Sequence, residues 1–208
     1  MFLRRLIDLS TSVSKLSHHI DISTSVRLDL AMWAEFLSSW NGVSFLPEPA
    51  VTSDFIALFT DAYFLGLGGF FQGQWLSHPW PYDMSNLTHI AVLELFAVFA
   101  TISAFAIPLT NKQITMFTDN EAIVAIWSSG TSNDKQLMAL VKELFFLTAR
   151  HNISVRFLHV PGRRNTFADL LSRLQVEAFK SICPDCSPNP TIISPRVMAV
   201  LDKILIPS

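Results

Sequence analysis

The segment from Ile90 to Leu109 is almost wholly apolar, yet it contains one carboxylate, Glu94. At about 20 residues it has the length of a membrane span. A carboxylate in lipid would be costly, and neither a second such segment nor a basic flank accompanies this one. We therefore expect a helix buried in a protein core. Glu94 is the only charge between His89 and Lys112, so it requires a partner.

The composition supports one folded domain with a large core. Of the 208 residues, 50% are hydrophobic and 15% are charged, and the formal net charge is only −2. This length suits a domain of ordinary size with flanking segments. Proteins that bind nucleic acid by themselves are usually more basic. Any basic surface is therefore local, or another domain supplies it.

The apolar periodicity predicts alternating strands and helices in the central part of the chain. Residues 1–50 are predicted to be helical, with a stop at Asn41-Gly42 and a linker at Pro47 and Pro49. Beyond them, the expected strands are 55–60, two more strands around glycines 66–73, then 113–118 and 153–159. The expected helices are 87–107, 121–127, 134–151 and one through Asp169 that Asn165 or Thr166 caps. Strands followed by alternating helices predict a mixed sheet with helices packed on it.

The C-terminal stretch, residues 178–208, is rich in proline and reads as a linker with one short helix near Val197 to Ile204. Its Cys183 and Cys186 form a Cys-x-x-Cys pair, which can be half of a zinc site or a redox motif. No second pair follows, and no βαβ context surrounds it. We expect inert thiols in a tail, a reducing compartment and no disulfide framework.

Four acids stand out by their positions. Asp61 ends the first predicted strand, Glu94 lies within the apolar helix, Asp119 ends the fourth strand, and Asp169 lies on the final helix. Strand ends gather at one edge of an open α/β sheet, where ligands usually bind. Taken singly, an Asp at a strand end often only caps a turn. Four converging carboxylates repel one another, and Mg²⁺ with its preference for oxygen ligands is a natural compensation.

These residues match a known family. Thr60-Asp61-Ala62, Glu94, Thr118-Asp119-Asn120 and Ala168-Asp169 together resemble the ribonuclease H signature. The most specific piece is residues 159–173, His-Val-Pro-Gly-Arg-Arg-Asn-Thr-Phe-Ala-Asp-Leu-Leu-Ser-Arg. It resembles the end of the ribonuclease H domain in retroelement polyproteins of the Ty-three/gypsy and DIRS-like kinds. Residues 27–42 resemble the DIRS-like connection between polymerase and nuclease.

The resemblance implies a fold and a domain organisation. The fold is the α/β ribonuclease H-like fold, a mixed five-stranded sheet with three antiparallel strands, then parallel strands, and helices on both faces. Residues 52–177 would form this domain. Residues 1–50 would be a helical connection segment resembling the end of a reverse transcriptase, and residues 178–208 a Pro-rich tail with a short helix.

The resemblance also implies an activity. The chain would be an endonuclease that hydrolyses the RNA strand of RNA–DNA hybrids during retroelement reverse transcription. Asp61, Glu94, Asp119 and Asp169 would hold two Mg²⁺ ions, or Mn²⁺, about 3.5–4 Å apart. One ion would lower the pKa of the attacking water, and the other would steady the leaving 3′ oxygen. His159 would relay protons or help to release product; its alternative is a strand-end histidine hydrogen-bonded to the backbone.

Substrate contacts and partners follow from the same resemblance. Arg163 and Arg164 are either phosphate contacts or part of a solvated basic loop. Asn120 either reaches a 2′-hydroxyl, the group that distinguishes RNA from DNA, or caps the next helix, and we favour the cap. A reverse transcriptase domain in the same polyprotein would be the partner, with no membrane involved. The location would be intracellular, in the cytoplasm or the nucleus.

Three features depart from the family pattern. Tyr63 stands where a small residue is usual, and it would crowd Asp61. Residues 120–151 lack a basic handle for substrate, and no Tyr-x-Asp-Asp polymerase motif occurs. The alternative function is an inactive or domesticated fragment that acts as a hybrid-binding or interaction module. A transposase or integrase would need a different final acid and would lack Glu94.

Overall fold

The structure is a computed structural model, and it describes residues 4–13, 15, 17, 19–38, 40 and 56–206. The chain forms two compact units, Met1–Ser44 and Phe45–Ser208. The first unit contains α1 (Arg4–Thr11) and α2 (Thr24–Ser38), where helices were expected. The predicted stop at Asn41-Gly42 and the linker prolines lie outside the described residues.

A five-stranded sheet with the order β3-β2-β1-β4-β5 forms the centre of the second unit. The first three strands are antiparallel: β1 (Ile56–Tyr63), β2 (Gly66–Phe71) and β3 (Gln74–Pro79). Next to β1, β4 (Gln113–Thr118) and β5 (Ser154–His159) run parallel to it. This arrangement confirms the expected mixed sheet.

The first strand is longer than predicted. Its pairing with β2 continues through Asp61, which lies opposite Gly68, and on to Tyr63, which lies opposite Gly66. Asp61 therefore lies inside β1 rather than at its end.

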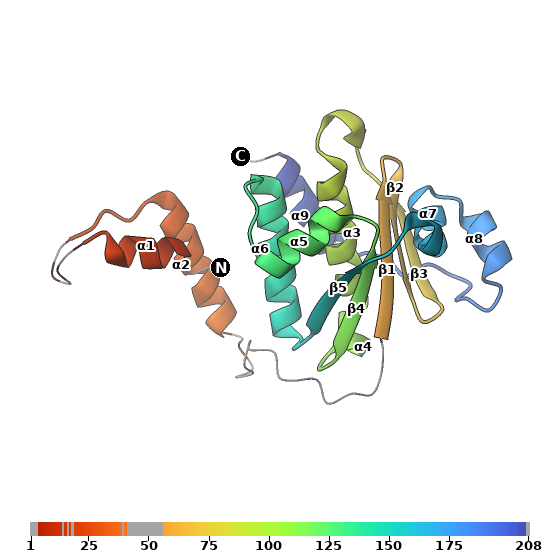
Figure 1. Ribbon diagram of the computed structural model, residues 1–208, viewed down its shortest axis with the longest axis horizontal. Coiled ribbons are helices and arrows are strands. Elements are labelled where there is room, and N and C mark those ends of the chain that lie inside the picture. The colour runs from red at the N-terminus through yellow and green to blue at the C-terminus, as the bar shows by residue number, and fades with distance from the viewer. Residues whose placement is uncertain are drawn as a thin grey trace. The chain divides into compact units, whose positions relative to one another are not determined.

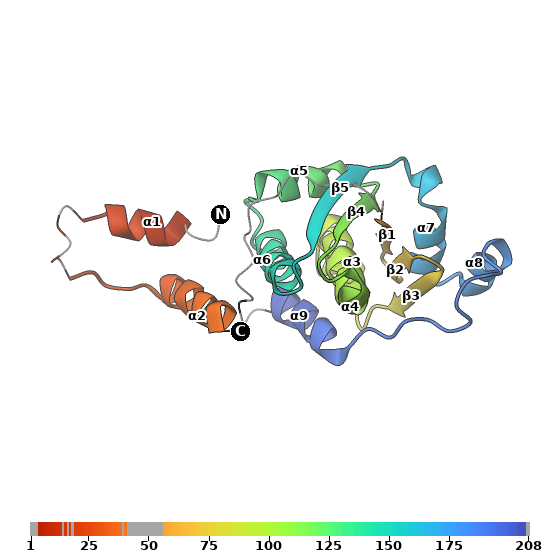
Figure 2. The same ribbon diagram turned by 90° about the horizontal axis from the view of Figure 1, so that it is seen from below.

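Helices cover both faces of the sheet, as expected (Figures 1 and 2). On one face α3 (Ile90–Ala104) packs against β1 and β2, and α6 (Lys135–Arg150) packs against α3. On the other face α7 (Thr166–Ser172) contacts β1, β2 and β3, and α8 (Val176–Ile182) follows it. The shorter α5 (Glu121–Ser129) lies beside β4 and β5.

The apolar segment forms a core helix, α3, in which almost every residue from Val92 to Ile102 is buried. It is shorter than predicted and is followed by α4 (Ala106–Leu109) after a break at Phe105. Pro108 explains this break, because its ring would collide with the carbonyl group four residues earlier, at Ala104, where α3 ends. Within the described part of the chain, no helix is long and apolar enough to cross a membrane.

Two neighbouring glycines of β2 allow the helices to approach the sheet closely. A Cβ atom at Gly68 would come within 2.6 Å of the Ser172 nitrogen and 2.7 Å of Leu171 Cβ, both on α7. A Cβ atom at Gly69 would collide with Thr101 of α3 on the opposite face. Each glycine therefore admits one helix, and the positions of α3 and α7 both depend on this short stretch of β2.

The C-terminal stretch is packed against the second unit and is not a free linker. Phe179 of α8 is fully buried in a cluster with Trp75 and Leu171. The chain then runs alongside β3, where the Trp75 indole donates a hydrogen bond of 2.7 Å to the Ser187 carbonyl oxygen. The prolines suit this extended path because they need no hydrogen-bond partner for a backbone N–H.

The predicted final helix is present as α9 (Pro195–Leu205), which contacts α6 and α3. Pro195 occupies its first turn, where proline is well tolerated. By contrast, α8 was not predicted separately. Its apolar residues are too few to give a clear period, and the aromatic cluster on the sheet stabilises it.

The expectation of two free thiols is wrong in this structure, because Cys183 and Cys186 form a disulfide. The turn after α8 brings their Cα atoms to 5.6 Å, a separation typical of disulfides. Both residues pack against the cluster around Trp75. The disulfide thus closes the turn after α8, and this turn packs against the cluster.

We predict that Gly68→Ala lowers the free energy of unfolding by about 2–3 kcal/mol, because the added methyl group overpacks against the α7 backbone. Thermal unfolding followed by circular dichroism measures this loss as a lower Tm. Gly73→Asn is the control: Gly73 has a φ of 80° and open space around it. Asparagine tolerates such a φ, so this variant should lose less than about 1 kcal/mol. Equal losses in the two variants would refute the close approach of α7.

Candidate active site

Asp61 lies near the carboxyl end of β1, and one of its oxygens, Oδ2, accepts a hydrogen bond from the Ser172 hydroxyl. Burial raises the pKa of Asp61 to about 6. The hydrogen bond from Ser172 opposes this shift, while the negative charges of Asp119 and Asp169 add to it. Asp61 is therefore close enough to both acids for their negative charges to disfavour its ionised form.

Glu94 lies in the second turn of α3, and it is the least buried residue in the middle of that helix. Burial raises its pKa to about 7, a hydrogen bond with the Asn120 side chain lowers it, and Asp119 and Asp61 raise it further. Its Oε2 atom is buried without a hydrogen-bond partner. A buried carboxylate oxygen without a partner is unfavourable unless a cation or a donor reaches it.

Asp119 follows β4 directly and is exposed. The loop after β5 passes beside it, since a Cβ atom at Gly162 would lie 3.2 Å from Asp119 Oδ2. Its neighbour Asn120 caps α5 by accepting a hydrogen bond of 2.9 Å from the Ala122 nitrogen. The cap that we favoured for Asn120 is thus the role observed, and its contact with Glu94 is an additional one.

Asp169 lies on α7, and its Oδ1 accepts a hydrogen bond of 2.7 Å from Arg173 Nε. The Arg173 guanidinium also lies over the Tyr63 ring, 4.2 Å from the ring centre. Tyr63 was expected to crowd Asp61, but its ring serves as a platform for this arginine. Asp169 and Arg173 are four residues apart on one helical face, so the sequence alone suffices to suggest their pairing.

His159 and the two arginines lie on either side of Pro161. His159 is the last residue of β5 and is partly exposed, with Nδ1 3.8 Å from Glu121 Oε1. Arg163 and Arg164 are exposed on the short helix η2 (Gly162–Arg164). Since η2 begins at Gly162, beside Asp119, both arginines belong to a loop at the rim of the acidic site.

The four acids lie near one another, but they do not form a complete coordination site for a metal ion. Among the described residues, no three His, Cys, Asp or Glu side chains form a group that would hold a metal ion as they stand. One contact helps to explain this: Arg173 engages Asp169. The donor set nevertheless fits a divalent cation, because it is made of carboxylate oxygens and includes the unpartnered Oε2 of Glu94.

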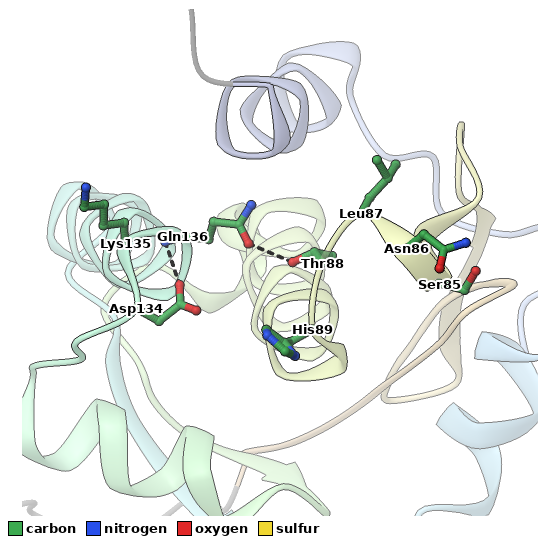
Figure 3. Close-up of a pocket in the computed structure, with 8 residues that line it drawn as sticks. All are labelled: Ser85, Asn86, Leu87, Thr88, His89, Asp134, Lys135 and Gln136. Carbon is green, nitrogen blue, oxygen red and sulfur yellow. Dashed lines mark hydrogen bonds between the residues drawn. The ribbon is translucent and has the colours of Figure 1, made fainter.

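A separate open pocket of about 690 Å³ lies at the start of α3 (Figure 3). Thr88 and Gln136 close one side through a hydrogen bond of 2.8 Å, and Asp134 caps α6 through the Gln136 and Leu137 nitrogens. The eight residues lining it come from η1 (Met84–Asn86), the entry to α3 and the start of α6: Ser85, Asn86, Leu87, Thr88, His89, Asp134, Lys135 and Gln136. None of the four acids lines it.

The sheet order and the converging acids define a domain of the ribonuclease H-like class. A family model described as reverse transcriptase-like matches residues 82–175, a segment that holds Glu94, Asp119 and Asp169. The fold is thus ribonuclease H-like, and the family model matches less than half of the chain. A comparison with curated proteins finds no significant match.

Several solved structures are similar to this chain. The N-terminal ribonuclease H domain of a Mycobacterium tuberculosis protein is 15% identical, with a TM-score of 0.47, over 57% of this chain and 95% of that one. Ribonuclease H1 of Halobacterium salinarum is 15% identical, with the same TM-score, over 60% and 99%. A foamy viral protease-reverse transcriptase is 12% identical, with a TM-score of 0.33, over 77% and 35%.

We predict that Glu94→Gln stabilises the metal-free protein at alkaline pH. The pKa of Glu94 is raised from 4.5 to about 7 in the folded state, so its favourable contribution is present at low pH and is lost as the pH rises through about 7. The gain in unfolding free energy should therefore grow from pH 5 to pH 8, to about 1–2 kcal/mol after allowance for solvent screening. Urea unfolding with a chelator measures it. Glu177→Gln, at an exposed acid of α8, is the control, and a pH-independent gain would contradict the prediction.

Proposed function

We propose that this chain is a metal-dependent ribonuclease H that cuts the RNA strand of RNA–DNA hybrids during retroelement reverse transcription. The observation that carries the proposal is the mutual electrostatic destabilisation of the acids. Burial is the main cause of the raised pKa of Asp61 and Glu94, Asp119 raises both further, and Asp169 adds to the shift of Asp61. Four segments that are far apart in sequence, β1, α3, the end of β4 and α7, thus bring like charges together, an arrangement typical of a functional site.

Asp61, Glu94, Asp119 and Asp169 are the residues that would hold two Mg²⁺ or Mn²⁺ ions. Such a pair supplies an activated water and neutralises the charge that develops on the leaving oxygen. The chain's own contribution is to hold the four carboxylates at one edge of the sheet. Arg173 and Ser172 keep two of them in place, and the Asn120 side chain contacts a third.

The loop after β5 would contact the nucleic acid beside the acids. Arg163 and Arg164 are both exposed there, next to Asp119 by way of Gly162. The two arginine side chains would attract the phosphates of the strand to be cut, although the net charge of the whole chain is −2. His159, at the start of the same loop, would move protons or help the product to leave.

A reverse transcriptase domain in the same polyprotein would supply further contacts that bind the hybrid. The family description, reverse transcriptase-like, and the helical first unit both support this partner. The low net charge supports it as well, because a domain with few basic residues binds hybrids weakly by itself.

We predict that the purified chain cleaves a labelled RNA–DNA hybrid with Mg²⁺ or Mn²⁺, and that Asp119→Asn lowers the rate at least about 100-fold, because a metal ion supplies several kcal/mol of stabilisation. Asp202→Asn, on α9, is the matched control and should keep full activity. Single-stranded RNA and duplex DNA should remain intact. Cleavage that persists in the purified Asp119→Asn protein would refute the assignment of the site. A lack of cleavage by the parent chain, even with the upstream polymerase region added, would favour an inactive module.

The arginines give a second prediction, on binding. Arg163→Ala and Arg164→Ala should each weaken hybrid binding, and each should reduce the slope of log affinity against log salt concentration by about one, because each removes one phosphate contact. Fluorescence anisotropy over a salt series measures both effects. Arg196→Ala, at an exposed arginine of α9, is the control. Unchanged slopes would identify the loop as a solvated surface instead.

A further inference from the structure

We propose that Ser172, at the end of α7, is a positioning residue that fixes the Asp61 carboxylate for a divalent cation. The inference rests on the proposed function, since it assumes that Asp61 is a metal ligand. It assigns a role to Ser172, which belongs to the Leu-Leu-Ser-Arg segment directly after Asp169.

The Ser172 hydroxyl has one proton to donate and two acceptor oxygens within reach. It lies within hydrogen-bond distance of Asp61 Oδ2 and 2.9 Å from the backbone carbonyl oxygen of Asp169. The second contact is one that many helical serines make with their own helix, three residues back. Ser181 of α8 makes it too, with Ala178. The contact with Asp61 is different, because it joins residues that are 111 positions apart in sequence.

The fold holds Ser172 firmly in this position. Its side chain is fully buried, and its backbone nitrogen lies against Gly68, the residue that pairs with Asp61 across the two strands. At the other end of α7, the Asn165 amide donates a hydrogen bond of 2.8 Å to the Thr60 carbonyl oxygen. One end of the helix is thus held on β1 at Thr60 and the other on β2 at Gly68, so Ser172 has little freedom to move away from Asp61.

A single hydrogen bond to one carboxylate oxygen has a useful consequence. It restricts the rotation of the carboxylate, and it leaves the second oxygen, Oδ1, free to bind a cation. Groups that orient metal ligands in this way typically contribute about 10- to 100-fold to metal affinity. Ser172 would act through Asp61 and would not touch the cation itself.

The test is Mn²⁺ binding to the full chain, measured by electron paramagnetic resonance of the free ion, with circular dichroism to verify folding. Ser172→Ala should weaken Mn²⁺ binding about 10- to 100-fold. Ser77→Ala is the matched control: Ser77 donates a hydrogen bond of 2.7 Å to the Leu171 carbonyl oxygen, so this variant also loosens α7 but leaves the carboxylates alone. It should bind Mn²⁺ within about twofold of the parent chain.

Either of two results would overturn the inference: Ser172→Ala binding Mn²⁺ like the parent chain, or Ser77→Ala losing as much affinity as Ser172→Ala. If Ser172→Ala does not fold, Ser172→Cys takes its place, because it keeps the side-chain size but is a weak hydrogen-bond donor. Undiminished binding in Ser172→Cys would then overturn the inference.

The variant Asp119→Asn tests the proposed metal site itself, independently of Ser172. If the parent chain binds no Mn²⁺, or Asp119→Asn binds it equally well, the proposed metal site itself is wrong.

Discussion

The close approach of α7 to β2 is the contact on which the candidate site depends. It is possible only because Gly68 has no side chain, so the α7 backbone rests directly on the strand. Asp61 lies opposite Gly68 in the sheet, and Asp169 lies on the helix that this contact positions. A displacement of α7 by the width of one methyl group would separate Asp169, Ser172 and Arg173 from Asp61 together. The first and last of the four site acids, Asp61 and Asp169, are thus brought together because Gly68 has no side chain.

The same packing brings the negative charges of the four carboxylates close together, and this lowers the stability of the metal-free protein. Burial and neighbouring carboxylates raise the pKa of Asp61 and Glu94, which means that their ionised forms are unfavourable in the metal-free protein. Arg173 and Ser172 relieve part of this repulsion, while Oε2 of Glu94 is left buried without a partner. Active sites commonly carry such a cost in stability, because groups arranged for a ligand are poorly satisfied without it. A divalent cation would satisfy these groups together.

The C-terminal segment shows how a pattern of residues can mislead. Its prolines suggested a linker, yet residues 176–205 add two helices and a stretch alongside β3 to the second unit. Proline prevents regular hydrogen bonding but does not prevent packing, and Phe179 finds its place beside Trp75 only once the sheet has formed. The Cys183–Cys186 disulfide at the end of α8 was missed for a related reason. Spacing permits such a bond, and the turn decides whether the two Cα atoms come close enough.

Periodicity and breaker residues were enough to predict the mixed sheet and most of its elements. The strand 113–118 was predicted with the bounds that the structure has, and Asn120 was expected to cap α5. Three of the four acids could be selected by position, because Asp61 and Asp119 stand at predicted strand ends and Glu94 stands alone in an apolar helix. Asp169 could be selected because its segment resembles the end of a ribonuclease H domain. The Arg173–Asp169 pair was also within reach, since helical spacing alone brings such residues together.

The remaining features depended on tertiary structure. The extension of β1 past Asp61 arises from pairing with β2, the contact of Ser172 with Asp61 spans 111 positions, and the Tyr63 ring meets Arg173 only after α7 has packed. Local sequence determines which residues are helical or extended, because backbone preferences and apolar spacing act over a few residues. It does not determine which side chains meet across the sheet, since that depends on how closely two elements pack. In this protein the sequence by itself determined the elements, their order and the acids, whereas the tertiary structure decided how those acids are held, through the space left at Gly68.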